Sequence, residues 1–277
     1  MIASAHAGAF LPTRARLAMA AGSWQMETMS ILRGLSLLFV LGAFSLGLAA
    51  CAHFAGEKRH WSQARWDSAG VAPAPERHPE AIVQVYGARA WGWRGIFGVH
   101  TWIAFKRENA RAWDRFEVVG WGVQRGVRAI RHNRHAPDGF WAGSPPELLG
   151  ELRGEAAARA IPAIEAAIES YPHDRLYRLW PGPNSNSFTA HVLRAVPGLD
   201  IELPPNAIGK DFLGPWRFLA PAPSRTGFQL SLFGLAGLTL AMNEGVEINL
   251  LGFTFGLDIT RPAIKLPGLG RLGMKAV

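Results

Sequence analysis

The chain contains 277 residues, which is enough for one sizeable core with an appended subdomain. Apolar residues make up 49% of it and charged residues only 18%, a composition that excludes disorder over most of the chain. The net charge of +8 suits contact with anionic lipid headgroups or cell-envelope polymers. Nucleic acid is not expected as a partner, because the N-terminal segment predicts membrane attachment.

Residues 31–50 form an apolar run of about membrane length that ends in Leu48-Ala49-Ala50-Cys51. This ending resembles the lipobox of bacterial lipoprotein signal peptides. The resemblance implies cleavage before Cys51 and a diacylglyceryl anchor on its sulfur. Cys51 is the only cysteine, so an intrachain disulfide is excluded. The alternative is an uncleaved signal-anchor helix, and either form attaches the protein to a membrane.

The N-terminal region is divided by its methionines and by this cysteine. Because a signal peptide would begin at Met26 or Met29, we interpret residues 1–28 as a non-native upstream extension or a cytoplasmic leader. Residues 29–50 are then the signal peptide, and residues 51–80 a linker rich in proline and alanine. Ala52, rather than aspartate, after the cysteine favours the outer membrane if the cell has one.

Strand signals begin the main domain, which we expect over residues 81–215. β-favouring runs predict strands at 82–86, 99–105 and 116–119, each bounded by glycine. Side chains alternate along a strand, so His100 shares one face with Trp102 and Ala104. Residues 124–143 are read as a basic loop. It contains histidines but no cysteine or carboxylate at matching spacing, so neither a metal nor another cofactor is expected.

Two helices are predicted later in this domain. Residues 155–170 carry an apolar stripe, although Pro162 either kinks this helix or begins a second piece. Residues 175–180 read as a brief strand. A second helix, with its stripe at 188–196, follows an Asn-Ser-Asn-Ser run that supplies N-cap oxygens, and Ser185 lies in its first turn. That position suits an acyl-transfer nucleophile, because helix N-termini favour nearby negative charge; simple capping is the alternative.

The C-terminal segment, residues 216–277, is predicted to be rich in β-strands. Apolar and polar residues alternate from 227 to 260, with glycine turns between runs, which predicts an antiparallel meander rather than a membrane helix. Its apolar face suits either the main domain or lipid. The predicted fold class is therefore α+β: a half-open antiparallel sheet with two or three helices, plus this meander.

Several strings resemble a bacterial family catalogued as domain of unknown function 3750, over residues from about 61 to the C-terminus. They are Val83-Gln-Val-Tyr86, Trp93-Arg-Gly95, His100-Thr-Trp-Ile103, Glu117-Val-Val-Gly-Trp121, Trp180-Pro-Gly-Pro-Asn-Ser-Asn186 and Ala207-Ile-Gly-Lys-Asp211. The string from Trp180 to Asn186 is the most specific of them. The resemblance brings no activity with it.

A second, fainter resemblance concerns the order of a histidine strand and a later helix. It is similar to the circularly permuted papain-like hydrolases, of the NlpC and lecithin:retinol acyltransferase kinds. That similarity implies His100 as base, Ser185 as nucleophile and Glu117 as the group that orients the imidazole. Asn184 and Asn186 are candidates for oxyanion or turn support.

The nucleophile departs from the papain-like pattern, which has cysteine where this chain has Ser185. A serine hydroxyl stays protonated beside a helix terminus and needs a general base. Two functions follow: a membrane-anchored serine hydrolase or acyltransferase acting on an ester or amide of the cell wall or lipid, or a non-catalytic envelope lipoprotein that binds cell-wall, lipid or protein partners.

Overall fold

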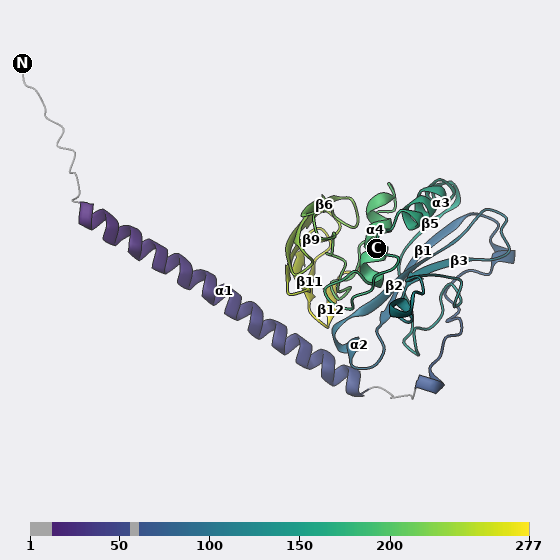
Figure 1. The fold of residues 1–277 in the computed structure, drawn as a ribbon, viewed down its shortest axis with the longest axis horizontal. Coiled ribbons are helices and arrows are strands. Elements are labelled where there is room, and N and C mark those ends of the chain that lie inside the picture. The colour runs from purple at the N-terminus through teal and green to yellow at the C-terminus, as the bar shows by residue number, and fades with distance from the viewer. Residues whose placement is uncertain (1–12, 56–60, 277) are drawn as a thin grey trace, which may run out of the picture. The chain divides into compact units, whose positions relative to one another are not determined.

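The computed structural model describes residues 13–55 and 61–276 (Figure 1). Its contacts divide the chain into one unit that ends at Phe44 and a second that begins at Ser45. Helix α1 (Thr13–Ala55) runs through this boundary. Within the described residues, Met26–Ala55 is long and apolar enough to cross a membrane, with a mean hydropathy of 2.2. This helix therefore fits a signal sequence or a membrane anchor.

The second unit contains two antiparallel sheets and three further helices. The first sheet has the strand order β4-β3-β2-β1-β5, and the second has the order β12-β11-β10-β9-β8-β7-β6. The elements of the first half are β1 (Ile82–Arg89), α2 (Arg94–Phe97), β2 (Val99–Lys106), β3 (Asp114–Val118), β4 (Ile130–His132), β5 (Glu147–Arg153), α3 (Gly154–Glu169) and α4 (Ser185–Ala195). Those of the second are β6 (Leu219–Pro221), β7 (Gly227–Leu232), β8 (Ala236–Ala241), β9 (Gly245–Leu250), β10 (Phe253–Asp258), β11 (Ala263–Leu266) and β12 (Gly270–Gly273).

This architecture confirms the predicted α+β fold with a C-terminal β meander. The strands β1, β2 and β3 overlap the three predicted runs, and α3 is one continuous helix that contains Pro162. Two local interpretations were wrong. The basic loop contains the short strand β4, and residues 175–180 have no strand: they continue a turn and end in a bend. There the Arg178 N–H donates to Pro183 O at 2.8 Å, so the backbone closes a turn and has no strand partner.

The two faces of the first sheet pack into separate cores. Helices α3 and α4 cover the face of Val83, Val85, Ile103 and Phe105. The opposite face carries Tyr86 and Trp102 and packs against aromatic side chains that include Trp113 and Trp141. Because β1 and β2 are central strands buried on both faces, they read as nearly continuous apolar runs.

Helix α4 is fixed against this sheet by its apolar stripe. Phe188, Val192 and Leu193 are fully buried in the core shared with β2 and α3. Burying side chains of this size contributes about 1.5–3 kcal/mol each. This packing fixes where the first turn of α4 meets the start of β2.

Candidate active site

The first turn of α4 is built around Asn184, the N-cap residue. Its Oδ1 accepts from the backbone N–H groups of Asn186 and Ser187, at 3.0 and 3.2 Å. The Ser187 hydroxyl in turn accepts from the Asn184 N–H at 2.7 Å, which completes a capping box. Ser185 is the first helical residue, and its hydroxyl is hydrogen-bonded to neither Asn184 nor Ser187.

Both asparagine side chains use their N–H groups to hold the surrounding loops. Asn184 Nδ2 donates to Leu179 O and Ile208 O, each at 3.0 Å. Asn186 Nδ2 donates to Val99 O at 3.0 Å and to Ile208 O at 2.8 Å. Neither amide therefore has an N–H left to donate to a bound ligand, and the two tie β2, α4 and the 208 loop together at Ser185.

Ser185 differs from its neighbours because its hydroxyl has no hydrogen-bond partner among the described residues. The residue is buried, with 4% of its surface exposed. Among the described residues, Arg115 Nε is the one polar side-chain atom that is buried from solvent and has no hydrogen-bond partner. The Ser185 hydroxyl also has no partner there, so its oxygen must be accessible to solvent. Ser185 instead lines a pocket of about 620 Å³.

His100 lines the same pocket, and its ring is fixed by contacts with Glu117 and Trp141. Its Nε2 lies 2.7 Å from Glu117 Oε2, and its ring stacks on Trp141 with a centroid distance of 3.5 Å. The same Glu117 oxygen accepts from Arg115 Nη2 at 3.0 Å. An ionised carboxylate can only accept, so the imidazole carries its proton on Nε2 and leaves Nδ1 as an acceptor.

Burial and charge set the protonation states of this group. Burial alone would raise the pKa of Glu117, but the hydrogen bond from His100 and the charge of Arg115 bring it to about 2. Burial lowers the pKa of His100 below its usual 6.5, against the opposing effect of Glu117. At neutral pH the carboxylate is therefore ionised and the imidazole is neutral, which is the state of a general base.

His100 and Ser185 reach the pocket from opposite sides of the sheet. Thr101 Oγ1 lies 2.9 Å from Asn186 Oδ1 and so faces α4; His100, one residue earlier, faces the other way. Both residues line the pocket at the start of β2, outside the segment from Ile103 to Phe105 that pairs with β3. No hydrogen bond joins the Ser185 hydroxyl to the His100 ring within the described part of the chain.

Residues 80–212 match a family model whose description reads "Protein of unknown function (DUF3750)". This segment belongs to the DUF3750 family. No curated protein and no solved structure matches the chain. The similarity to papain-like hydrolases therefore stays a prediction, and so do the roles of Ser185, His100 and Glu117. All three residues lie inside the DUF3750 segment.

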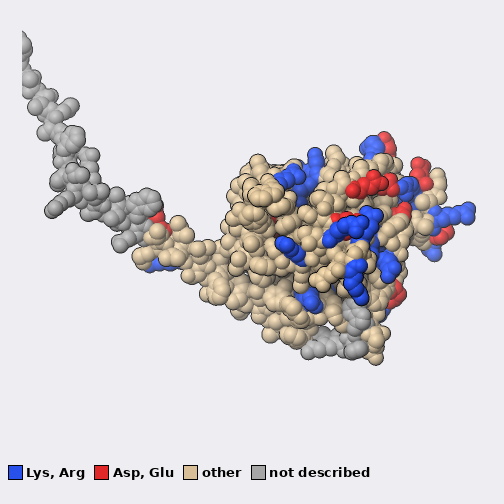
Figure 2. Space-filling model, in the orientation of Figure 1, with Lys and Arg blue, Asp and Glu red and all other residues tan. Residues whose placement is uncertain are grey.

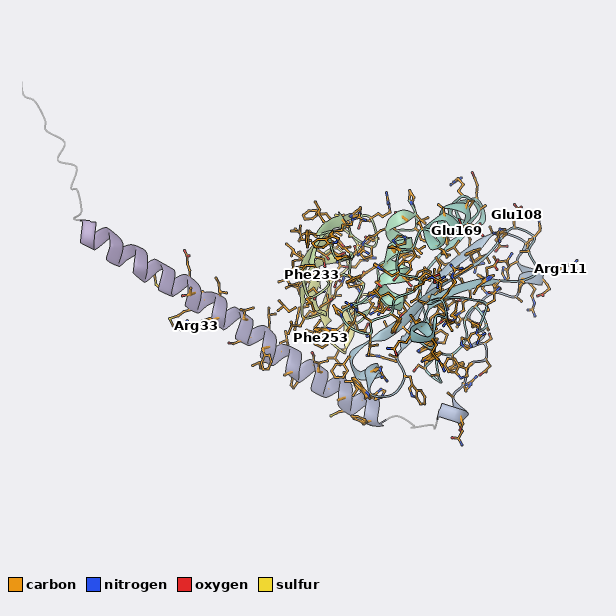
Figure 3. All side chains as sticks on the ribbon, viewed as in Figure 1. Arg33, Glu108, Arg111, Glu169, Phe233 and Phe253 are labelled. Atoms are coloured by element: carbon orange, nitrogen blue, oxygen red, sulfur yellow. The ribbon has the colours of Figure 1, made fainter. Side chains whose placement is uncertain are left out.

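The wall of the DUF3750 pocket is largely aromatic. Trp93, Phe97, Trp121, Tyr177 and Trp180 line it together with Trp141. Phe253, from β10 of the second sheet, also lines the pocket and is labelled in Figure 3. Gly120 makes room for Tyr177, because a Cβ there would lie 2.5 Å from the ring. The pocket thus offers a largely apolar surface beside the Ser185 hydroxyl and the His100 imidazole, and Arg94 also lines it.

Sequence reasoning missed two residues that shape this site. Arg115 supplies the charge that keeps Glu117 ionised, and its position two residues before Glu117 on one strand was a readable signal. Trp141, which the imidazole stacks on, comes from a distant loop that no local pattern connects to His100. Among the described residues, no group of three histidine, cysteine or acidic side chains is placed to hold a metal ion.

Proposed function

We propose that this protein is a membrane-anchored serine hydrolase or acyltransferase, with Ser185 as nucleophile and His100 as general base. The observation that carries the proposal is the unpartnered Ser185 hydroxyl at a helix N-terminus, in one pocket with a neutral imidazole. Every other polar side chain of that turn is engaged in holding the backbone. A hydroxyl left free there is unusual for a purely structural serine.

In the proposed reaction, Ser185 Oγ attacks the acyl carbon of an ester or amide while its proton passes to His100 Nδ1. The C–O bond to the enzyme forms, and the carbonyl electrons move onto the oxygen. That oxyanion lies at the N-terminus of α4, where the Ser185 N–H has no acceptor within the helix. The asparagine amides are not donors here, because their N–H groups already bond to carbonyl oxygens.

The tetrahedral intermediate then collapses with loss of the alcohol or amine, which takes the proton from His100. Water, or an acceptor alcohol or amine, attacks the acyl-serine by the same steps in reverse and releases the product. Glu117 holds the imidazole in the required tautomer and stabilises its cation. The proposal requires the Ser185 hydroxyl and the His100 ring to come within hydrogen-bond distance when substrate binds, since catalytic hydrogen bonds often tighten only in the complex.

The aromatic wall indicates the substrate class. A pocket of about 620 Å³ lined by tryptophan and phenylalanine favours an acyl or alkyl group beside the scissile carbonyl. An ester or amide of the cell envelope, in lipid or cell wall, has that chemistry and would be within reach of an anchored enzyme.

The proposed anchor is the lipidated N-terminus. Cys51 is exposed near the C-terminal end of α1, where an acyl chain on its sulfur would find no steric obstacle in the described residues. In this proposal the protein lies on the exported side of a bacterial membrane, the outer membrane where one exists. Metabolic labelling with an alkynyl fatty acid should mark the wild-type protein and not Cys51→Ala. An uncleaved signal anchor would leave both unmarked.

A fluorophosphonate probe tests the catalytic proposal in membranes from cells expressing the full chain. We expect covalent labelling of wild type and none of Ser185→Ala. Ser170→Ala is the control, because Ser170 is an exposed serine at the C-terminus of α3 and its hydroxyl bonds to Ala167 O, away from the first turn of α4. This control should retain labelling, and a similar melting temperature of all three proteins would show that they are folded.

The alternative is a non-catalytic envelope protein that binds a ligand or partner in this pocket. One observation favours it: the Ser185 hydroxyl and the His100 ring are not hydrogen-bonded to each other. Equal labelling of wild type and Ser185→Ala would support this alternative and remove the enzyme proposal.

A further inference from the structure

The second sheet has its apolar side chains on the outside. Paired residues on adjacent strands share a face, so each strand adds one residue to a row across the sheet. One such row crosses all seven strands and consists of Pro221, Phe228, Leu240, Val246, Leu257, Ile264 and Leu272. Most of these side chains are exposed, Leu257 at 56%. A second row of Leu219, Leu230, Leu238 and Ile248 runs beside it and ends at Phe255, which is buried.

The inner face of the same sheet is polar and charged. The corresponding buried row contains Gln229, Thr239, Glu247 and Lys265. Lys265 Nζ lies 2.7 Å from Glu247 and 2.6 Å from Glu202. A shift of one residue in register would expose these ion pairs and bury the apolar row. The buried ion pairs therefore determine which face of the sheet is turned inward, and the apolar face is turned outward as a result.

The exposed apolar residues of this face extend across the whole width of the sheet. Seven strands at about 4.8 Å spacing span roughly 30 Å. A contiguous apolar surface of that width marks an interaction site. Figure 2 shows one side of the molecule, on which most charged side chains lie over the first sheet and few over the second.

The end of the apolar N-terminal helix packs on this same sheet. Ala49 is buried, and a Cβ added to Gly268 in the β11–β12 turn would lie 2.9 Å from its Cβ. Arg89 Nη1 fixes that turn by donating to Gly268 O at 2.6 Å. Residues 45–55 are the last turns of the candidate membrane span, so the β11–β12 turn of the sheet lies beside the C-terminal end of that span.

The β6 edge of the sheet has the composition of a membrane interface. Trp216 is 87% exposed, and Phe218 and Leu219 beside it are also exposed. Arg217 and Arg225 flank them and line a cavity of about 270 Å³ whose lining includes no carboxylate. Tryptophan with arginine is the pairing enriched where acyl chains give way to anionic headgroups.

We propose that the outward face of the second sheet rests on the bilayer, with its apolar rows at the acyl boundary and Arg217 and Arg225 against anionic headgroup phosphates. This contact is additional to the N-terminal anchor, and it is independent of whether Ser185 is catalytic. It would hold the unit flat on the membrane instead of leaving it attached through its N-terminus alone.

The test places an environment-sensitive dye on the sheet of the full chain reconstituted in vesicles. In a Cys51→Ala background, Leu257→Cys is labelled with nitrobenzoxadiazole. Leu148→Cys is the matched control, because Leu148 is an exposed leucine on β5 of the first sheet. We expect doxyl-labelled lipid to quench the dye at 257 and not at 148. Equal quenching at both positions, or none at either, would overturn the proposal.

Two further outcomes are informative. A dye at 257 that is shielded from water but not quenched by lipid, with chemical crosslinking between chains, would assign the face to a second copy and overturn the bilayer contact. The headgroup half is tested by Arg217→Ala with Arg225→Ala in vesicles containing phosphatidylglycerol. We expect this double variant to lose quenching at 257, and wild type to lose it in purely zwitterionic vesicles. Unchanged quenching in both would overturn the headgroup assignment.

Discussion

Replacement of Gly209 by alanine should destabilise the N-terminus of α4 and with it the candidate nucleophile. Gly209 has a φ of +98°, and a Cβ there would lie 2.6 Å from Asn184 Oδ1. This amide cannot move aside freely, because it makes four hydrogen bonds to backbone groups. The alanine methyl and the N-cap side chain therefore compete for one space.

The magnitude follows from what would be lost. An alanine at positive φ costs about 1–2 kcal/mol. Loss of an N-cap costs about 1 kcal/mol, and two further hydrogen bonds cost about 1 kcal/mol each. We expect a total loss of about 4–5 kcal/mol. Gly198→Ala is the matched control, since Gly198 has a φ of +80° and open space around its Cβ. It should lose only the backbone part.

The assay is thermal unfolding of the full chain in detergent, followed by the fluorescence of its eleven tryptophans. The difference of about 3 kcal/mol between the two variants corresponds to a melting temperature about 6–12 °C lower for Gly209→Ala. Fluorophosphonate labelling of Ser185 should also fall in that variant alone. Equal melting temperatures for Gly209→Ala and Gly198→Ala would refute the claim that Gly209 holds the cap.

Three other outcomes are expected. The pKa of Glu117 is about 2 in the folded protein, against an ordinary value of 4.5. Its ionisation therefore stabilises the fold fully above pH 4.5, and this contribution, at most about 3 kcal/mol, is lost as the pH falls through 2. Glu117→Gln should flatten the dependence of stability on pH over that range, while a change at the exposed Glu108 (Figure 3) should not. Since burial keeps the pKa of His100 below 6.5, fluorophosphonate labelling should persist at pH values just below 6.5, and an inflection above 6.5 would contradict a buried neutral base. Gly120→Ala should displace the Tyr177 ring and slow labelling by bulky aromatic probes more than by small ones, and identical slowing of both would argue against Tyr177 as part of the pocket wall.

The central strands and the first turn of α4 could be predicted because their signals are local. β-Favouring residues between glycines mark β1 and β2, and the Asn-Ser-Asn-Ser run supplies a cap wherever the helix packs. The strand expected at 175–180 failed for a non-local reason: the carbonyl of Leu179 accepts from the Asn184 side chain, so the backbone there serves the cap and not a sheet.

The tail shows a different limit of sequence reasoning. Alternation predicts a sheet with one apolar and one polar face, but the pattern is the same whichever face is buried. The decision was made by partners distant in sequence. Glu202 and Lys210 supply charges that pair with Lys265 and Glu247, which makes the polar face the inner one.

The site itself could be predicted only in part. His100 and Ser185 were candidates by residue type and position, and both line one pocket. Their approach depends on where β2 and β3 stop pairing, which no single strand records. The asparagine roles depended likewise on where the Val99 and Ile208 carbonyls lie.

The buried pair between Lys210 and Glu247 bears on where the molecule can be cut. The family match ends at residue 212, two positions after Lys210. The counterion of Lys210 is Glu247, which lies beyond this limit on β9. The Arg194 guanidinium likewise reaches across that boundary to Pro221 O. A fragment trimmed to the family limits would lose the Glu247 carboxylate that pairs with the Lys210 ammonium group. The meander and the family-matched segment therefore belong to one folding unit, and each depends on the other for its stability.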